Sequence, residues 1–393
     1  MSREEFINNQ WLPYPSILSD GSAFFFGRVS EVNKDFIQLV NQQDFLKYLV
    51  KDTCELQDDH YGPSISPEYL KVGDAVVFIE DKRAIYLLSP CLRADKDFLN
   101  TGATEWALFL ESIAIFFKTR KFIHLQTPNL VVSPGVDHHI DFLQVEAVKT
   151  GRRWCLPTSP EIHLKKYLCQ GYDRIFEIKN CFRDDLASEH HKVEFTMLEW
   201  YRAYVNLDAI KNDVCDLLKS LVPNIPEPES LRVSEAFMKW LGFELKPETS
   251  RDELYQLASA CGLDTASDDD WNDLFFRIFM EKIEPQLGLS GPLFLSHFPS
   301  QQASLSQIDG EGWSQRFELY WQGVELANAY LEVNNPEENR KIFLSEQSLR
   351  EKKGASVAEV DEGFFNKLES GMPPASGIAL GLDRLFKLTQ KHS

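Results

Sequence analysis

Arg183 lies between two segments whose residue patterns favour β-strands. Apolar and polar residues alternate in residues 176–182 and again in residues 194–201. We therefore expect two antiparallel strands joined by a loop rich in charged residues, with Arg183 near the end of the first strand. An arginine there can make a planar, two-pronged contact with a phosphate or a carboxylate. The alternative is a surface hairpin whose charged loop is simply solvated.

A second candidate site is a pair of glutamates near residue 320. Glu318 and Glu325 are an odd number of residues apart, so one unbroken strand would point them to opposite faces. A turn at Gln322 and Gly323 would instead make two antiparallel strands and bring both carboxylates to one face. Two carboxylates placed together repel each other unless a cation joins them. The pattern therefore predicts a Mg²⁺ site with phosphate oxygens as further ligands.

Two more segments combine chemistry with a clear local structure. Residues 156–161 read Leu-Pro-Thr-Ser-Pro-Glu before a helical pattern, where Ser159 suits a helix cap and Pro160 the first helical position. The helix dipole favours Glu161 in that first turn, which is a purely structural explanation for it. Residues 377–385 form a Gly-rich apolar strand that runs into a helix opening with Asp383 and Arg384.

Taken in order, these segments resemble the class II aminoacyl-tRNA synthetases of the lysyl branch. Residues 182–201 resemble class motif 2, and residues 377–385 resemble motif 3. A helical apolar pattern at residues 108–117 and a strand before Pro128 resemble motif 1, which forms the dimer interface in that class. Residues 298–307, Phe-Pro-Ser-Gln-Gln-Ala-Ser-Leu-Ser-Gln, are similar to a narrower branch, the elongation factor P lysine ligases. Three motifs in order over about three quarters of the chain make the resemblance specific.

The resemblance implies an ATP-dependent ligase that uses Mg²⁺. Such an enzyme activates lysine or (R)-β-lysine as an aminoacyl-adenylate and transfers it to a lysine side chain of elongation factor P. No protein nucleophile is needed, because catalysis consists of positioning and charge neutralisation. The resemblance also implies a homodimer.

The resemblance assigns nucleotide-binding roles to residues of this chain. Arg183 would hold the α-phosphate and the substrate carboxylate, and Arg384 the γ-phosphate. His191 and Phe195 would frame ATP, with the Phe195 ring stacked on adenine. The implied catalytic residues are Arg183, Glu325 and Arg384, and the implied metal ligands are Glu318 and Glu325. The implied ATP-binding residues are Arg183, Asp185, His191, Lys192, Phe195, Glu325, Leu326, Gly381 and Arg384.

The resemblance assigns a second set of residues to the amino acid. Glu332 and Tyr201 would bind its terminal ammonium and Glu161 the other ammonium, since burying an ammonium without an acidic partner is prohibitive. Asn328 would place the carboxylate. The implied substrate-binding residues are Ser159, Glu161, Tyr201, Asn328, Glu332 and Ala379. Ala379 stands where lysyl synthetases usually have glycine and where related ligases also have alanine.

The expected fold class is α+β, with a class II synthetase-type antiparallel sheet flanked by helices. Residues 1–92 carry short strand patterns between turns and resemble a small oligonucleotide-binding barrel. Residues 93–393 would form the catalytic domain, with a helical insertion at about 206–290. The acidic triplet at residues 268–270 is best explained as a solvated helix start.

Composition narrows the class of protein. The net charge of -19 argues against tRNA as the main partner, because nucleic-acid binders usually carry a basic surface. The seven cysteines are scattered and odd in number, which argues against a disulfide framework and a zinc site. The sequence has no signal-peptide pattern and no apolar run long enough to span a bilayer, so we expect a cytoplasmic protein.

Two other functions remain open from the sequence. A lysyl-tRNA synthetase would be recognised by the formation of lysyl-tRNA. A non-catalytic, synthetase-like binding module is suggested by Asp185 and Lys192, which replace the Glu and Asn usual in the family. ATP–pyrophosphate exchange that depends on an amino acid would exclude such a module.

Overall fold

The computed structural model describes residues 24–33, 35–40, 45–49, 57–58, 62–63, 70–71, 74–79, 83–89, 101–135, 137, 139–185 and 192–391. The chain divides into two compact units, Met1–Leu108 and Phe109–Ser393. The boundary predicted between residues 92 and 93 lies outside the described residues. Each unit is described by itself.

The N-terminal unit contains a small antiparallel sheet, as its short strand patterns predicted. Its strand order is β3-β2-β1-β6-β7, and a bulge between Val29 and Glu31 bends β1. Closure of this sheet into a barrel stays a prediction. The strands are β1 (Phe24–Val32), β2 (Phe36–Val40), β3 (Phe45–Leu49), β6 (Ala75–Ile79) and β7 (Ala84–Ser89), beside the short pair β4 (Gln57–Asp58) and β5 (Gly62–Pro63). The core residues are Val29, Ile37, Leu39, Leu70, Val76, Phe78 and Ile85.

The C-terminal unit is built on an eight-stranded sheet of order β13-β14-β15-β16-β17-β12-β11-β8. Neighbouring strands are antiparallel except at β13–β14 and β11–β8, which are parallel. This arrangement confirms the predicted α+β class with an antiparallel-rich sheet. The strands are β8 (Ile123–His124), β11 (Arg174–Phe182), β12 (Glu194–Ala203), β13 (Glu229–Arg232), β14 (Leu293–Pro299), β15 (Trp313–Trp321), β16 (Val324–Leu331) and β17 (Ala375–Gly381), beside the small pair β9 (Gln144–Glu146) and β10 (Arg153–Cys155).

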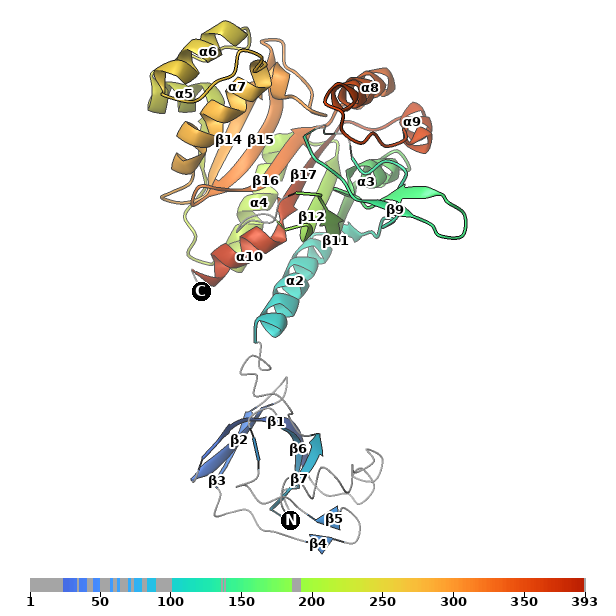
Figure 1. Cartoon of the computed structure of the whole chain (residues 1–393), viewed down its shortest axis with the longest axis vertical. Helices are drawn as coiled ribbons and strands as arrows, with labels where there is room; N and C mark the ends of the chain where they lie inside the picture. The colour runs from blue at the N-terminus through green and yellow to red at the C-terminus, as the bar shows by residue number, and fades with distance from the viewer. Residues whose placement is uncertain are drawn as a thin grey trace. The chain divides into compact units, whose positions relative to one another are not determined.

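Two groups of helices share apolar cores with this sheet; in Figure 1, α5, α6 and α7 lie at the upper left and α8 and α9 at the upper right. One apolar core joins α5, α6 and α7 to β14 and β15, and another joins α3, α8 and α9 to β11 and β12. The helices are α2 (Thr101–Thr119), α3 (Glu161–Leu168), α4 (Leu207–Leu221), α5 (Val233–Leu241), α6 (Arg251–Ala260), α7 (Trp271–Ile278), α8 (Pro336–Lys352), α9 (Glu362–Glu369) and α10 (Leu382–Gln390). Short helical turns follow at Phe279–Ile283, Glu284–Gln286 and Ser300–Gln302.

The segment predicted as a helical insertion holds α4 to α7 but also one strand. β13 pairs in parallel with β14 and extends the sheet. The reason is tertiary: Leu231 of β13 packs against the core of α5 to α7, which a four-residue pattern cannot reveal. The acidic triplet is a helix start, as predicted, because the Asp270 side chain accepts a hydrogen bond from the backbone N–H of Asp273 at the first turn of α7.

Two charged residues of β11, Glu177 and Lys179, are buried, which the alternating sequence pattern does not reveal. Glu177 is 2% exposed and accepts a hydrogen bond of 2.8 Å from the backbone N–H of Thr127. Lys179 donates to the Thr127 carbonyl at 2.8 Å and to Asn129 Oδ1 at 2.7 Å. One face of β11 therefore packs apolar side chains, while the other anchors the segment that follows β8.

Candidate active site

A cavity of about 440 Å³ lies against the middle of the large sheet. Side chains of four neighbouring strands, β15, β16, β17 and β12, line it, together with residues of α7, α10 and the loop before α3. Register explains why residues far apart in sequence meet there. Ala379 on β17 is paired with Glu199 on β12 and with Asn328 on β16, so the three side chains stand side by side on one face.

Most residues predicted from the sequence line this cavity. They are Ser159, Glu161, Arg183, Asp185, Lys192, Phe195, Glu318, Glu325, Leu326, Asn328, Ala379, Gly381 and Arg384. The side chains of Tyr201 and Glu332 are buried, with 3% and 1% exposed. The Tyr201 hydroxyl donates to Glu199, which lines the cavity, and Glu332 pairs with Lys165, which also contacts the lining residue Glu161. His191 lies outside the described residues.

Two arginines face the cavity from different elements. Arg183 follows β11, and its backbone N–H donates to the Val193 carbonyl at 3.0 Å where the β11–β12 loop begins and ends. Its guanidinium carbon lies 5.0 Å from the centre of the Phe195 ring, and its Nε is buried without a hydrogen-bond partner among the described residues. Arg384 of α10 donates to the Glu325 carbonyl at 2.8 Å. Such guanidinium groups are suited to phosphate or carboxylate oxygens.

Glu318 and Glu325 stand on the two strands of a hairpin, as predicted. The turn is Gln322–Gly323, where both residues have positive φ angles of 53° and 73°. A bulge after Leu319 pairs Tyr320 with Glu325, which puts Glu325 on the same face as Glu318. The two carboxylates line the cavity, where Mg²⁺ could complete its oxygen shell with phosphate and water.

The surroundings of Glu318 are more crowded than the sequence suggests. Its carboxylate contacts the Arg316 guanidinium and accepts a hydrogen bond of 2.7 Å from the Tyr320 hydroxyl. Burial raises the pKa of Glu318, while Arg316 opposes that rise. Glu284, which the sequence analysis missed, has its pKa raised to about 7 by burial and by Glu325. Within the described part of the chain, no group of three or more His, Cys, Asp or Glu side chains is arranged to hold a metal ion by itself.

A buried acidic cluster, formed by residues of α3, of β12 and of the segment after β16, lies beside the cavity. We use this name for Glu161, Lys165, Glu199, Tyr201 and Glu332. Glu199 is 1% exposed; its Oε2 accepts a hydrogen bond of 3.1 Å from the Tyr201 hydroxyl, and its Oε1 has no partner among the described residues. Burial, and after it the charge of Glu161, raise the pKa of Glu199 well above its usual value. A buried carboxylate oxygen beside a cavity provides a site for an ammonium or another donor.

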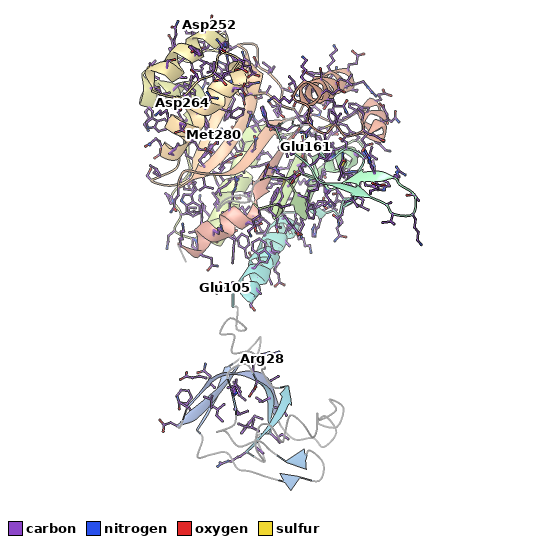
Figure 2. All side chains as sticks on the ribbon, in the orientation of Figure 1. Arg28, Glu105, Glu161, Asp252, Asp264 and Met280 are labelled. Atoms are coloured by element: carbon purple, nitrogen blue, oxygen red, sulfur yellow. The ribbon has the colours of Figure 1, made fainter. Side chains whose placement is uncertain are left out.

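Lys165 is the cation of the acidic cluster. Its Nζ lies 2.6 Å from Glu161 Oε1 and 2.6 Å from Glu332 Oε2. The first contact is an aligned hydrogen bond, while the second is an ion pair without that alignment. Glu161 and Glu332 therefore share one internal partner, whereas the sequence analysis assigned each to a separate ammonium of a substrate. Glu161 opens α3 and is labelled in Figure 2.

The helix α3 begins one residue later than the sequence predicted. Pro160 occupies the cap position, and its carbonyl accepts from the backbone N–H groups of His163 and Leu164, both at 3.0 Å. The Ser159 hydroxyl accepts from the Glu161 N–H at 3.3 Å, so it still satisfies a free donor at the helix start.

Sequence reasoning missed Glu199 and Lys165, although both leave a signal. Glu199 is two residues before Tyr201 on a strand, and side chains at that spacing share a face. Lys165 is four residues after Glu161 on a helix, a spacing at which opposite charges pair. Neither pattern shows that the side chains are buried, which is what distinguishes them here.

Among the residues that the structure describes, no helix is long and apolar enough to cross a membrane.

Comparison with known proteins identifies the family. The family of class II tRNA synthetases (D, K and N) matches residues 106–393. A curated protein of Haemophilus influenzae named elongation factor P--(R)-beta-lysine ligase is 36% identical over 289 residues, which cover 72% of this chain and 88% of that protein.

Relatives of the same name from other organisms agree with this match. The proteins of Proteus mirabilis and Pectobacterium atrosepticum are each 34% identical over 72% of this chain, covering 89% and 90% of their own lengths. The matched region holds the large sheet, the cavity and every predicted site residue. This chain therefore belongs to the class II tRNA synthetase (D, K and N) family, together with relatives named elongation factor P--(R)-beta-lysine ligase.

Proposed function

We propose that this protein activates lysine or (R)-β-lysine with ATP and transfers it to a lysine side chain of elongation factor P. The names of the relatives support this acceptor and this class of amino acid. The observation that carries the proposal is the combination, in one cavity, of two arginines suited to phosphate and a buried carboxylate, Glu199, whose free oxygen is suited to an ammonium.

The first step joins the amino acid to AMP. A carboxylate oxygen of the amino acid attacks the α-phosphorus of ATP, the bond to the bridging oxygen breaks, and pyrophosphate leaves. Arg183 neutralises the charge that builds on the α-phosphate, and Arg384 holds the γ-phosphate. When bound, Mg²⁺ would neutralise phosphate charge, with Glu318 and Glu325 as its protein ligands. The other residues predicted from the sequence to bind ATP would act in this step; they are Asp185, His191, Lys192, Phe195, Leu326 and Gly381.

The second step transfers the activated group. The neutral amine of the acceptor lysine attacks the carbonyl carbon of the adenylate, AMP leaves, and the amine loses a proton to solvent. The product is an amide, so each cycle produces AMP and pyrophosphate. The chain needs no nucleophile of its own for either step.

The acidic cluster would select the amino acid. Glu161, Glu199 and Glu332 provide carboxylates for the ammonium groups. Asn328 of β16, two strands away from Glu199, would orient the carboxylate of the substrate. The Ala379 methyl stands between Glu199 and Asn328 and narrows the space around the reacting end of the substrate. A diamino acid has the charges that such a cluster neutralises, whereas a neutral side chain would leave a buried carboxylate unpaired.

We also propose the wider organisation predicted from the sequence. Residues 1–92 would form an oligonucleotide-binding-like domain and residues 93–393 the catalytic domain, with the insertion at about 206–290. The enzyme would act as a cytoplasmic homodimer on a translation factor, and tRNA would not be its acceptor.

ATP–pyrophosphate exchange tests the proposal without any acceptor. We expect exchange that requires lysine or (R)-β-lysine and that fails with norleucine, which has the same chain length but lacks the second ammonium. Added elongation factor P should then gain the mass of one residue. Lysyl-tRNA formation without modification of elongation factor P would instead support a lysyl-tRNA synthetase, and absence of exchange with both diamino acids would refute the proposal.

A further inference from the structure

Lys165 is buried where the desolvation of its charged side chain is unfavourable. Its side chain is 1% exposed, and so is that of Glu332. The two residues come from α3 and from the segment after β16, which are far apart in the sequence. Burial lowers the pKa of Lys165, but Glu161 and then Glu332 outweigh it, so the pKa is raised overall and the ammonium stays charged.

A buried ion pair of this kind is a weak explanation for stability. Desolvating two charges costs several kcal/mol, which their attraction does little more than offset, and apolar residues of similar volume often stabilise as well or better. An apolar side chain would therefore serve the contact between α3 and the sheet equally well. The presence of a charge at this position points to a role for the charge itself.

The charged and titratable groups around Lys165 come from each element packed against it. On its own helix it contacts Glu161, and Cys169 lies one turn further along. Glu199 of β12 and Glu332, which follows β16, also face it, and the Tyr201 hydroxyl bonds to Glu199. Three carboxylates, those of Glu161, Glu199 and Glu332, thus surround the Lys165 ammonium. When all three are ionised, the ammonium balances one of their charges and the acidic cluster keeps two net negative charges.

We propose that Lys165 is a positioning residue that fixes Glu161 and Glu332 and sets the charge of the acidic cluster to match the two ammonium groups of a diamino acid. The inference rests on the proposed function. Without Lys165, the cluster would hold one negative charge too many. The excess would be removed by a proton on one of the carboxylates, because buried like charges raise one another's pKa.

The test compares Lys165→Met with wild type in ATP–pyrophosphate exchange with lysine and (R)-β-lysine. Methionine keeps the length of the side chain and removes its charge. We expect the KM of the amino acid to rise about tenfold or more, with the KM of ATP little changed. We also expect the acid limb of kcat/KM for the amino acid to move to higher pH by about one unit.

Matched variants separate this role from a structural one. Lys166→Met removes the neighbouring lysine of α3, which pairs with Asp361 at 2.5 Å and not with the cluster, and should leave the pH profile in place. Lys165→Arg keeps the charge and should keep the acid limb near that of wild type. If Lys165→Met fails to fold, the double variant Lys165→Met/Glu332→Gln removes both charges and restores the balance of two, so its acid limb should return toward wild type.

Each result has a definite meaning. An unchanged acid limb in folded Lys165→Met, or equal increases in the KM of ATP and of the amino acid with a lower Tm, would overturn the inference and leave the proposed function standing. An acid limb in the double variant that stays about one pH unit or more above that of wild type would also overturn it. A wild-type enzyme inactive with both diamino acids would refute the proposed function, and the inference would fall with it.

Discussion

Lys192 Nζ lies 2.7 Å from Asp383 Oδ1, and this ion pair connects the loop after β11 to the first turn of α10. The second oxygen of Asp383 accepts a hydrogen bond of 2.7 Å from the backbone N–H of Thr196 on β12. Asp383 thus connects α10, which carries Arg384, to the end of the β11–β12 loop, which begins at Arg183. Lys192, which departs from the residue usual in the family, has a partner within the site.

Lys192 and Asp383 should differ in how much each contributes to ATP binding. Lys192 is 57% exposed, and such ion pairs contribute little, so Lys192→Ala should raise the KM of ATP by about threefold at most. Asp383→Ala also removes the bond to Thr196 and should raise that KM by about tenfold or more. The ATP dependence of pyrophosphate exchange measures both. Equal effects of the two substitutions would show that the hydrogen bond from Thr196 to Asp383 adds nothing to ATP binding beyond the ion pair.

Arg183→Ala should reduce adenylate formation by about a thousandfold, because the charge on the α-phosphate loses its partner in the transition state. Arg183→Lys should recover little of this loss, since an ammonium cannot make the two-pronged contact. Single-turnover formation of the adenylate measures the effect directly. Exchange at the wild-type rate in Arg183→Ala would remove Arg183 from the mechanism.

The pH dependence of amino acid binding should follow Glu199. The ionised carboxylate binds an ammonium and the protonated form does not. Because burial, and after it Glu161, raise the pKa of Glu199, the KM of the amino acid should fall as the pH rises through that raised pKa. Glu199→Gln should raise this KM by about tenfold or more.

A control for this assignment is Tyr201→Phe. The Tyr201 hydroxyl donates to Glu199 at 3.1 Å and favours its charged form, so its loss should move the fall in KM to still higher pH. Steady-state measurements across a range of pH, with ATP saturating, would detect the shift. A KM independent of pH in wild type would contradict the role of Glu199.

Gly377 should tolerate no side chain. A Cβ at this position would lie 2.2 Å from the Tyr201 ring and 2.6 Å from Glu332 Oε1. Gly377→Ala should therefore displace both residues, raise the KM of the amino acid and destabilise the fold by about 1–3 kcal/mol. Gly310→Ala is a matched control, because a Cβ there meets no atom within 4 Å. Thermal unfolding and exchange kinetics of the two variants give the comparison; a Gly377→Ala variant as active as the control would refute this packing argument.

The sequence alone determined the parts of the site that depend on local pattern and order. The spacing of Glu318 and Glu325, with a turn-forming pair between them, required a hairpin, and the hairpin is present. The strand patterns around Arg183 specified antiparallel neighbours, which β11 and β12 are. Periodicity also predicted the helical segment at about 206–290, in which α4 and α5 each bury one apolar face.

Tertiary structure decided which polar residues are buried and which charges meet. Alternation along β11 predicted a strand but not the environment of its polar side chains, and Glu177 and Lys179 are buried. The alignment of Glu199, Ala379 and Asn328 on three successive strands, with Ala379 paired to both of the others, depends on strand order in the sheet. The ion pair of Lys165 with Glu332 joins a helix to a strand end far away in the sequence. Local pattern carries no information about such contacts, because they are set by the packing of elements whose order in space differs from their order in the chain.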